Sequence, residues 1–138
     1  MTRPFFLLLL AFSVNASANC QAGPIEPFGE FLKVFGENKS FAIKRTDYPL
    51  IHIDHDYDDG TPTPPAVKRS LISKNDDAST LPIAVLAREN NLELNLISQK
   101  KLSAVVQMQK PDTDWMLTYH FVRKGTCWYL TRIEDYSL

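Results

Sequence analysis

The sequence predicts an α+β domain in which N-terminal helices pack on a curved antiparallel sheet, in the order α-α-β-β-α-β-β-β-β. A phenylalanine-rich stripe with helical spacing lies early in the chain. Apolar and polar residues alternate at 92–97, which is typical of a half-buried strand. Residues 102–133 contain three segments rich in Val, Thr and aromatic residues, joined by short polar turns. Helices that precede a run of antiparallel strands are typical of this fold class, because one apolar sheet face needs a cover.

Two helices are expected first. A helix is predicted over 24–33, because prolines suit a first helical turn and apolar residues then follow at positions i, i+3, i+4 and i+7. These residues are Phe28, Phe31, Leu32 and Phe35. Gly36 indicates the end of this helix, and Ser40 is the expected cap of a second short helix that ends at Arg45. We interpret the stripe as core packing.

A hairpin and a third helix are expected next. Strands are predicted at 50–53 and 66–73, with a polar, proline-rich loop between them. A helix of two to three turns is predicted at 81–90. Four strands complete the sheet, at 92–97, 102–109, 115–123 and 127–133.

Residues 1–18 have the three parts of a secretory signal peptide. Arg3 supplies the positive charge, and 5–14 form a short apolar run. Ala16-Ser17-Ala18 matches the Ala-x-Ala pattern at which signal peptides are cleaved. The run is too short to span a bilayer, which needs roughly 20 apolar residues, and no later segment approaches that length. We therefore expect cleavage near Ala18, a single domain over 19–138 with no transmembrane segment, and a periplasmic or secreted location.

Two cysteines remain after cleavage, Cys20 and Cys127. In an oxidising compartment a disulfide between them is expected. It would close a long loop, and on a chain-entropy model this would stabilise the folded chain by roughly 4 to 5 kcal/mol. One alternative is lipidation of Cys20, although Ser17-Ala18-Asn19 fits a lipoprotein signal poorly. Two free thiols are the third possibility.

Composition and motifs argue against several functions. The formal net charge of −1 is too close to neutral to suggest binding to nucleic acid or to an anionic membrane. The sequence has no glycine-rich phosphate loop, no Cys-x-x-Cys pair and no serine nucleophile motif. We expect no cofactor.

Two local patterns resemble a known family. One is 28–35, followed by Ser40-Phe41 and by Tyr48-Pro49-Leu50; the other is the aromatic strand 119–123, which turns and returns as Trp128-x-Leu130-x-x-Ile133. Together they resemble the nuclear-transport-factor-two-like (cystatin-like cone) superfamily, in particular its small exported bacterial proteins. The resemblance implies a cone-shaped domain. It assigns no activity, because that superfamily holds isomerases, dehydratases, ligand carriers and non-catalytic binding modules.

The densest polar cluster lies at 52–59 and contains His52, Asp54, His55, Asp56, Asp58 and Asp59. Its Asp-x-Asp-x-Asp run suggests calcium, but an EF-hand loop needs glycine and glutamate where this chain has Asp59 and Pro65. Two histidines in an aspartate-rich loop also lack the closed ligand set of structural zinc. We expect no metal here, and we interpret Asp54, Asp56, Asp58 and Asp59 as an acidic loop that could contact a protein partner.

Tyr48, Tyr119 and His120 are the only residues placed to act inside a cone. Strand alternation puts Tyr119 on the apolar face with Leu117, and His120 on the opposite face with Thr118. We therefore expect His120 outside the cone and assign no catalytic residue.

The function expected from these observations is non-catalytic binding in the cell envelope. One concrete option is an immunity or inhibitor protein whose acidic loop enters a basic cleft of a toxin. The alternatives are a small cofactor-free enzyme or a carrier of a small apolar ligand, either of which would use the interior of the cone, and an accessory subunit of an envelope complex. A homodimer through the outer sheet face is also possible. A cone whose interior is filled by Phe28, Phe31, Phe35, Trp115 and Trp128 would rule out the enzyme, whereas an enclosed cavity with a polar group deep inside would favour it.

Overall fold

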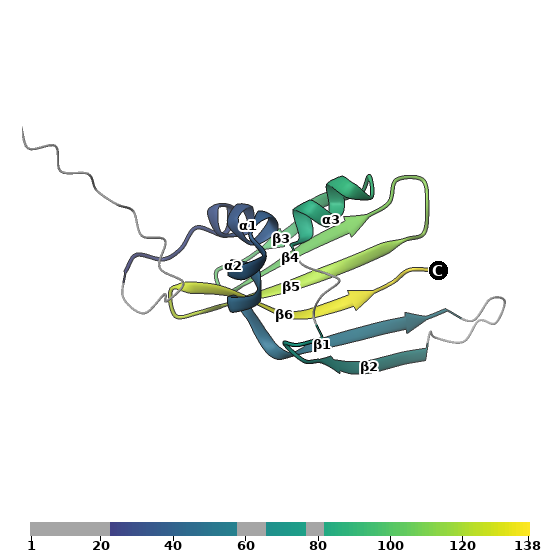
Figure 1. The fold of residues 1–138 in the computed structure, drawn as a ribbon, viewed down its shortest axis with the longest axis horizontal. Coiled ribbons are helices and arrows are strands. Elements are labelled where there is room, and N and C mark those ends of the chain that lie inside the picture. Colours follow the sequence, from purple (N-terminus) through teal and green to yellow (C-terminus); the bar gives the residue numbers. More distant parts are fainter. Residues whose placement is uncertain (1–22, 58–65, 77–81) are drawn as a thin grey trace, which may run out of the picture.

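The computed structural model describes residues 23–57, 66–76 and 82–138 (Figure 1). The helices in these residues are α1 (Phe28–Glu37), α2 (Lys39–Lys44) and α3 (Ile83–Glu89). The strands are β1 (Thr46–Asp56), β2 (Ala66–Ile72), β3 (Glu93–Gln99), β4 (Ser103–Gln109), β5 (Met116–Lys124) and β6 (Cys127–Asp135). This element order is the order expected from the sequence. None of the helices in the described ranges is long and apolar enough to cross a membrane.

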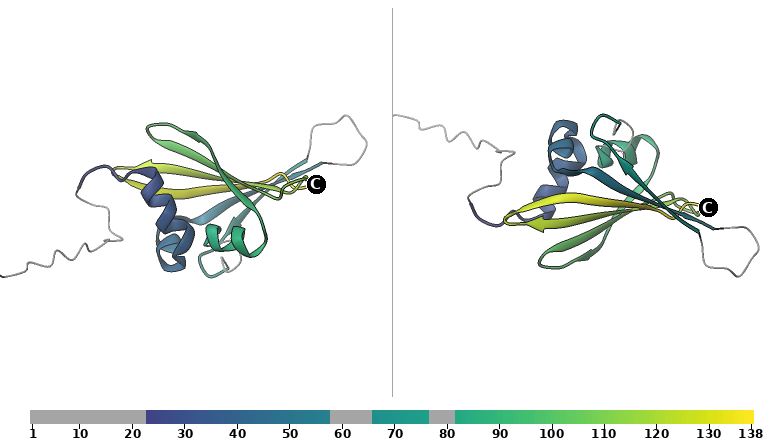
Figure 2. Two further views of the ribbon diagram at one scale, coloured as in Figure 1. Left: turned by 90° about the horizontal axis from the view of Figure 1, so that it is seen from above. Right: turned by 90° about the horizontal axis from the view of Figure 1, so that it is seen from below.

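The strands form one sheet in the order β2-β1-β6-β5-β4-β3. β1 and β6 are parallel, and every other neighbouring pair is antiparallel, so the sheet is mixed where a wholly antiparallel one was expected. The three helices lie on the same side of the curved sheet (Figure 2). We call this side the helix face and the opposite side the open face.

The aromatic residues of α1 fill the space against the sheet. Phe28, Phe31 and Phe35 are 2%, 1% and 0% exposed. Their ring centroids lie 5.5, 5.6 and 5.3 Å from that of Phe121 in β5, and Phe28 lies 4.9 Å from Trp128 in β6. Edge-to-face contacts at these distances are favourable beyond the area they bury. The stripe is core packing, as its helical spacing predicted.

The boundaries of the first helices differ from those expected. α1 begins at Phe28, because the preceding segment is extended and its Glu26 N–H donates to the carbonyl of Thr126 at 3.0 Å. Asn38 ends α1 and caps α2 by accepting from the Phe41 N–H at 2.9 Å, so the expected Ser40 cap is wrong. Asparagine is an equally strong cap, and it stands one residue before the helix, where the geometry needs it.

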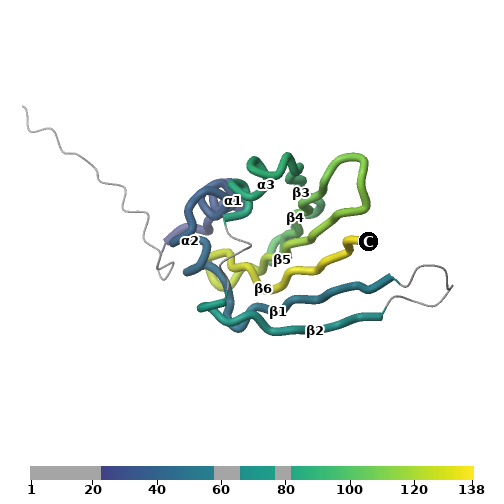
Figure 3. Tube along the Cα trace, turned by 45° about the vertical axis from the view of Figure 1, so that its right-hand side comes forward, coloured from purple at the N-terminus to yellow at the C-terminus, as the bar shows by residue number. Residues whose placement is uncertain are grey.

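Strand β1 is longer than the predicted 50–53. Its backbone pairs with β2 on one side and β6 on the other as far as Asp54, and with β2 as far as Asp56. The assignment of Asp54, His55 and Asp56 to a loop was therefore wrong, because β2 pairs with all three residues, and β6 also pairs with Asp54, despite their polar side chains. The far ends of β1 and β2 extend beyond the helices (Figure 3). Asp58 and Asp59 lie outside the described residues, as do the predicted signal peptide and Cys20.

Candidate functional site

The polar cluster of β1 is divided between the two faces of the sheet. His52 is in register with Ile133, a residue of the core on the helix face. His55 contacts Glu134 of β6 from the open face. Because side chains alternate along a strand, His52 and Asp54 lie on the helix face, and His55 lies on the open face. The cluster thus contributes to two separate groups of side chains.

The group on the open face is centred on Glu134, which is 7% exposed. Its carboxylate lies 3.2 Å from Nε2 of His55 and 2.8 Å from Nε of Arg132, and it accepts from the Tyr136 hydroxyl. The His55 and Tyr136 rings stack at 4.1 Å between centroids, with 9° between their planes. We call these residues, together with His120, the Glu134 network.

His120 adds a second imidazole to this network. Nη2 of Arg132 lies 3.2 Å from Nδ1 of His120, so Nδ1 is the acceptor and the proton is on Nε2. Nε2 in turn lies 3.3 Å from Oγ1 of Thr118 and 3.5 Å from Glu134. Burial first, and then the charge of Arg132, lower the pKa of His120 below its ordinary value. The imidazole is therefore neutral at neutral pH.

The network holds Glu134 as an anion. Burial alone would raise the pKa of its carboxyl, but hydrogen bonds from Tyr136 and His55 and the charge of Arg132 outweigh burial and lower it. Burial first, and then the hydrogen bond to Glu134, raise the pKa of Tyr136 to about 12. A carboxylate engaged by several donors is a weak base, so this arrangement suits binding or stability better than proton abstraction.

Val67 and Leu71, each 61% exposed, lie on the open face in β2.

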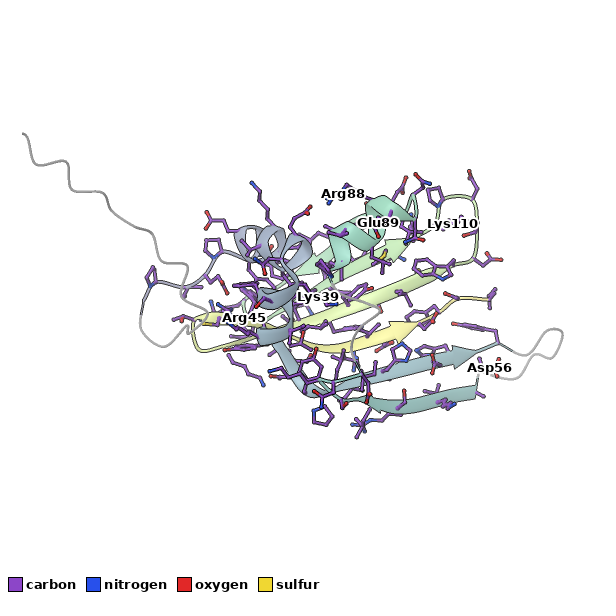
Figure 4. All side chains as sticks on the ribbon, viewed as in Figure 1. Lys39, Arg45, Asp56, Arg88, Glu89 and Lys110 are labelled. Carbon is purple, nitrogen blue, oxygen red and sulfur yellow. The ribbon has the colours of Figure 1, made fainter. Side chains whose placement is uncertain are left out.

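The group on the helix face consists of His52, Asp54 and Asp135. Nδ1 of His52 lies 3.4 Å from Oδ1 of Asp54, and one ligand atom from each of the three residues lies within 4.8 Å of the others. Asp54 and Asp135 of this group line a hollow of about 330 Å³, together with His55, Asp56, Lys68 and Ser137. Asp56 lies at the end of β1 furthest from Arg45 (Figure 4).

The residues considered for catalysis do not form a site. Tyr119 is 0% exposed in the core, and His120 points to the open face, as strand alternation predicted. The two side chains therefore cannot act on one substrate. Tyr48 packs at the edge of the core. Cys127 is buried at the start of β6, and its expected pairing with Cys20 stays a prediction, because Cys20 is outside the described residues.

The interior of the cone contains little free space. Five surface hollows in the described residues are lined by side chains other than Phe28, Phe31 and Phe35. A hollow of about 290 Å³ at the rim, between α3 and the sheet, is lined by Trp115 and Lys110 among others. This hollow is open to the surface, unlike an enclosed substrate chamber.

Sequence reasoning missed Glu134, Asp135 and Tyr136. The predicted last strand ended at Ile133, and the acidic residues that follow it carry no apolar alternation. The signal that could have found them is their position directly after a strand, where alternation assigns consecutive residues to opposite faces.

Comparison with solved structures decides the fold. An NTF2-like protein from Bacteroides fragilis NCTC 9343 superposes with a TM-score of 0.60 at 18% identity, over 86% of this chain and 50% of that protein. The chain has an NTF2-like fold. The chain spans half the length of the Bacteroides fragilis protein, and identity at this level supports the NTF2-like fold alone.

Other solved structures are less similar. An NTF2-like protein of unknown function from Shewanella oneidensis MR-1 is 12% identical over 78% of this chain and 94% of that one, with a TM-score of 0.42. A DUF4783 family protein from Bacteroides uniformis ATCC 8492 is 14% identical over 81% of this chain and 96% of that one, also with a TM-score of 0.42. No protein-family model matches the sequence, and no curated protein matches it.

Proposed function

We propose that the protein is an exported, non-catalytic binding domain that contacts a protein partner in the cell envelope through the acidic end of the β1–β2 hairpin. The observation that supports this most is the packing of Phe28, Phe31 and Phe35 against β5 and β6, which occupies the space where an NTF2-like enzyme or carrier would need a chamber. The alternative of chemistry or ligand transport inside the cone is not favoured for the same reason.

The acidic end of the hairpin is the surface proposed to meet the partner. Asp56 is exposed at the end of β1, and Asp58 and Asp59 follow it in the sequence. A concentration of carboxylates on a projecting hairpin would complement a basic cleft and speed the encounter with it. An inhibitor or immunity protein that blocks a secreted toxin would use such a surface.

The contact is tested with an envelope extract. The purified chain is used as bait beside a triple variant, Asp56→Asn, Asp58→Asn and Asp59→Asn, which keeps Asp54. A matched control neutralises three exposed acids near the opposite edge of the sheet, in β3 and in the β4–β5 turn, through Glu93→Gln, Asp112→Asn and Asp114→Asn. We expect the same partner with the native chain and the control, a loss with the hairpin variant, and weaker capture at high salt. Equal capture by both variants would rule out the proposed surface.

Export and the state of the cysteines are tested on protein from cells that express the full chain. Mass spectrometry of the periplasmic and secreted fractions is expected to find a chain that begins at Asn19. Cys20 and Cys127 should accept a thiol-alkylating reagent only after reduction. A lipid-modified Cys20 in the membrane fraction, or alkylation without a reductant, would contradict this part of the proposal.

A further inference from the structure

Residues 52–59 alone predicted no metal site, but β6 adds a third ligand, and we propose that His52, Asp54 and Asp135 bind a divalent transition-metal ion of the zinc class. The three side chains come from neighbouring strands. His52 and Asp54 are two residues apart in β1 and share a face, and Asp135 of β6 is in register with Asp54. The parallel pairing of β1 with β6 therefore brings together ligands that lie far apart in the sequence.

The spacing of the ligand atoms suits a single ion. One atom from each residue lies within 4.8 Å of the other two, and the His52–Asp54 pair is closer, at 3.4 Å. Ligands at about 2.1 Å from zinc in a tetrahedral site are about 3.4 Å apart. Small rotations of the aspartate side chains would close the set. The group stands on two paired strands, which hold ligands more firmly than loops do.

The donor types indicate which ion would bind. An imidazole nitrogen favours zinc, cobalt, nickel or copper, whereas calcium and magnesium prefer oxygen ligands alone. The imidazole also separates this group from an ordinary cluster of surface carboxylates. Three protein ligands leave a fourth position that would accept water or a group from a bound molecule, and two of the three, Asp54 and Asp135, line the hollow of about 330 Å³.

Two neighbouring residues affect the proposed site. One orients a carboxylate ligand, and the other carries a positive charge that would repel the ion. The N–H of Ser137 donates to Oδ1 of Asp135 at 2.8 Å, which orients that carboxylate and leaves Oδ2 for an ion. Lys68 is in register with Asp54 on β2 and lines the same hollow. Its ammonium group competes with a metal for the carboxylates, so removal of this charge should strengthen metal binding.

The test uses untagged, chelator-treated protein and zinc chloride alone, followed by calorimetry. We expect saturable binding of one ion per chain. His52→Gln and Asp135→Asn should each weaken binding at least tenfold, and Lys68→Met should strengthen it several-fold. The matched control is His55→Gln, a histidine three residues away on the opposite face, which should change the affinity less than twofold.

Cobalt chloride gives an independent measurement, because the visible absorption of bound Co²⁺ reports its coordination geometry. Absence of saturable binding would overturn the proposal, and so would equal losses in His52→Gln and His55→Gln, since they would indicate adventitious binding to surface histidines. If His52→Gln is poorly folded by circular dichroism, Asp135→Asn decides the result. These measurements need no partner protein, so their outcome does not depend on the proposed binding function.

Discussion

Glu26 and Arg45 form an ion pair that fastens the segment before α1 to the sheet. Nη1 of Arg45 lies 2.9 Å from Oε2 of Glu26, and the arginine is 1% exposed. The same nitrogen donates to the carbonyl of Trp128 at 3.2 Å, and the guanidinium carbon lies 4.9 Å from the ring centroid of Phe41. Glu26 also accepts from the backbone N–H of Trp128 at 3.1 Å. One carboxylate thus balances a buried cation and pairs with β6.

Glu26→Gln should reduce the free energy of unfolding by about 2–3 kcal/mol. The substitution removes the negative charge 2.9 Å from the buried guanidinium of Arg45, and the effect lies below that of a fully buried pair because the Glu26 side chain is 20% exposed. Urea unfolding measures the change. Glu37→Gln is the matched control, because it breaks the exposed pair between Glu37 and Arg88 and should leave stability unchanged. Equal losses in both variants would contradict this account.

Phe35→Ala should destabilise the fold by about 3–5 kcal/mol, because it leaves a cavity between α1 and β5. Phe35 is 0% exposed and contacts both Phe31 and Phe121. Val34→Ala, on the exposed side of the same helix, should change the unfolding free energy by less than about 0.5 kcal/mol. A small effect at Phe35 would mean that α1 does not fill the interior, and the case against an internal chamber would fail with it.

Stability should fall as the pH drops below about 6.5, the ordinary pKa of histidine. The pKa of His120 is lower in the folded chain than in the unfolded chain, so protons bind preferentially to the unfolded chain. This contribution is fully present above 6.5 and is lost between that pH and the lower folded value. His120→Gln should therefore flatten the dependence of the urea midpoint on pH in this window. An unchanged slope would show that His120 is not the group responsible.

Alkaline titration of the tyrosines should reveal a group that ionises near pH 12. The hydrogen bond to Glu134 and the burial of the ring assign this group to Tyr136. Ultraviolet difference spectra should lose the late step in Tyr136→Phe, and the step should move to lower pH in Glu134→Gln. Persistence of the step in Tyr136→Phe would place it on another tyrosine.

The sequence predicted the element order because each segment carries its own local signal. The phenylalanine stripe required a helix with one buried side, and the alternation at Tyr119 and His120 assigned these neighbours to opposite faces. The predicted end of β1 was wrong because its last residues are polar and acquire strand structure only from their neighbours. The parallel pairing of β1 with β6 has no local signal, since it joins segments about eighty residues apart.

The candidate sites were harder to predict for the same reason. The aspartates and histidines of 52–59 were interpreted as one loop, but β1 places His52 and His55 on opposite faces. Each then meets residues that follow the last predicted strand, Asp135 on one side and Glu134 on the other. Residue types alone could not reveal either group, because their assembly depends on the order of the strands.

The position of β6 in the sheet has a consequence for folding. It comes after every other strand in the sequence, yet it lies between β1 and β5, and β1 and β2 are hydrogen-bonded to the rest of the sheet only through it. Before β6 is synthesised, a nascent chain can form two separate ribbons but no continuous sheet. The cooperative step must then wait for residues near 135, and the long sequence separation of the final pairing predicts slow folding.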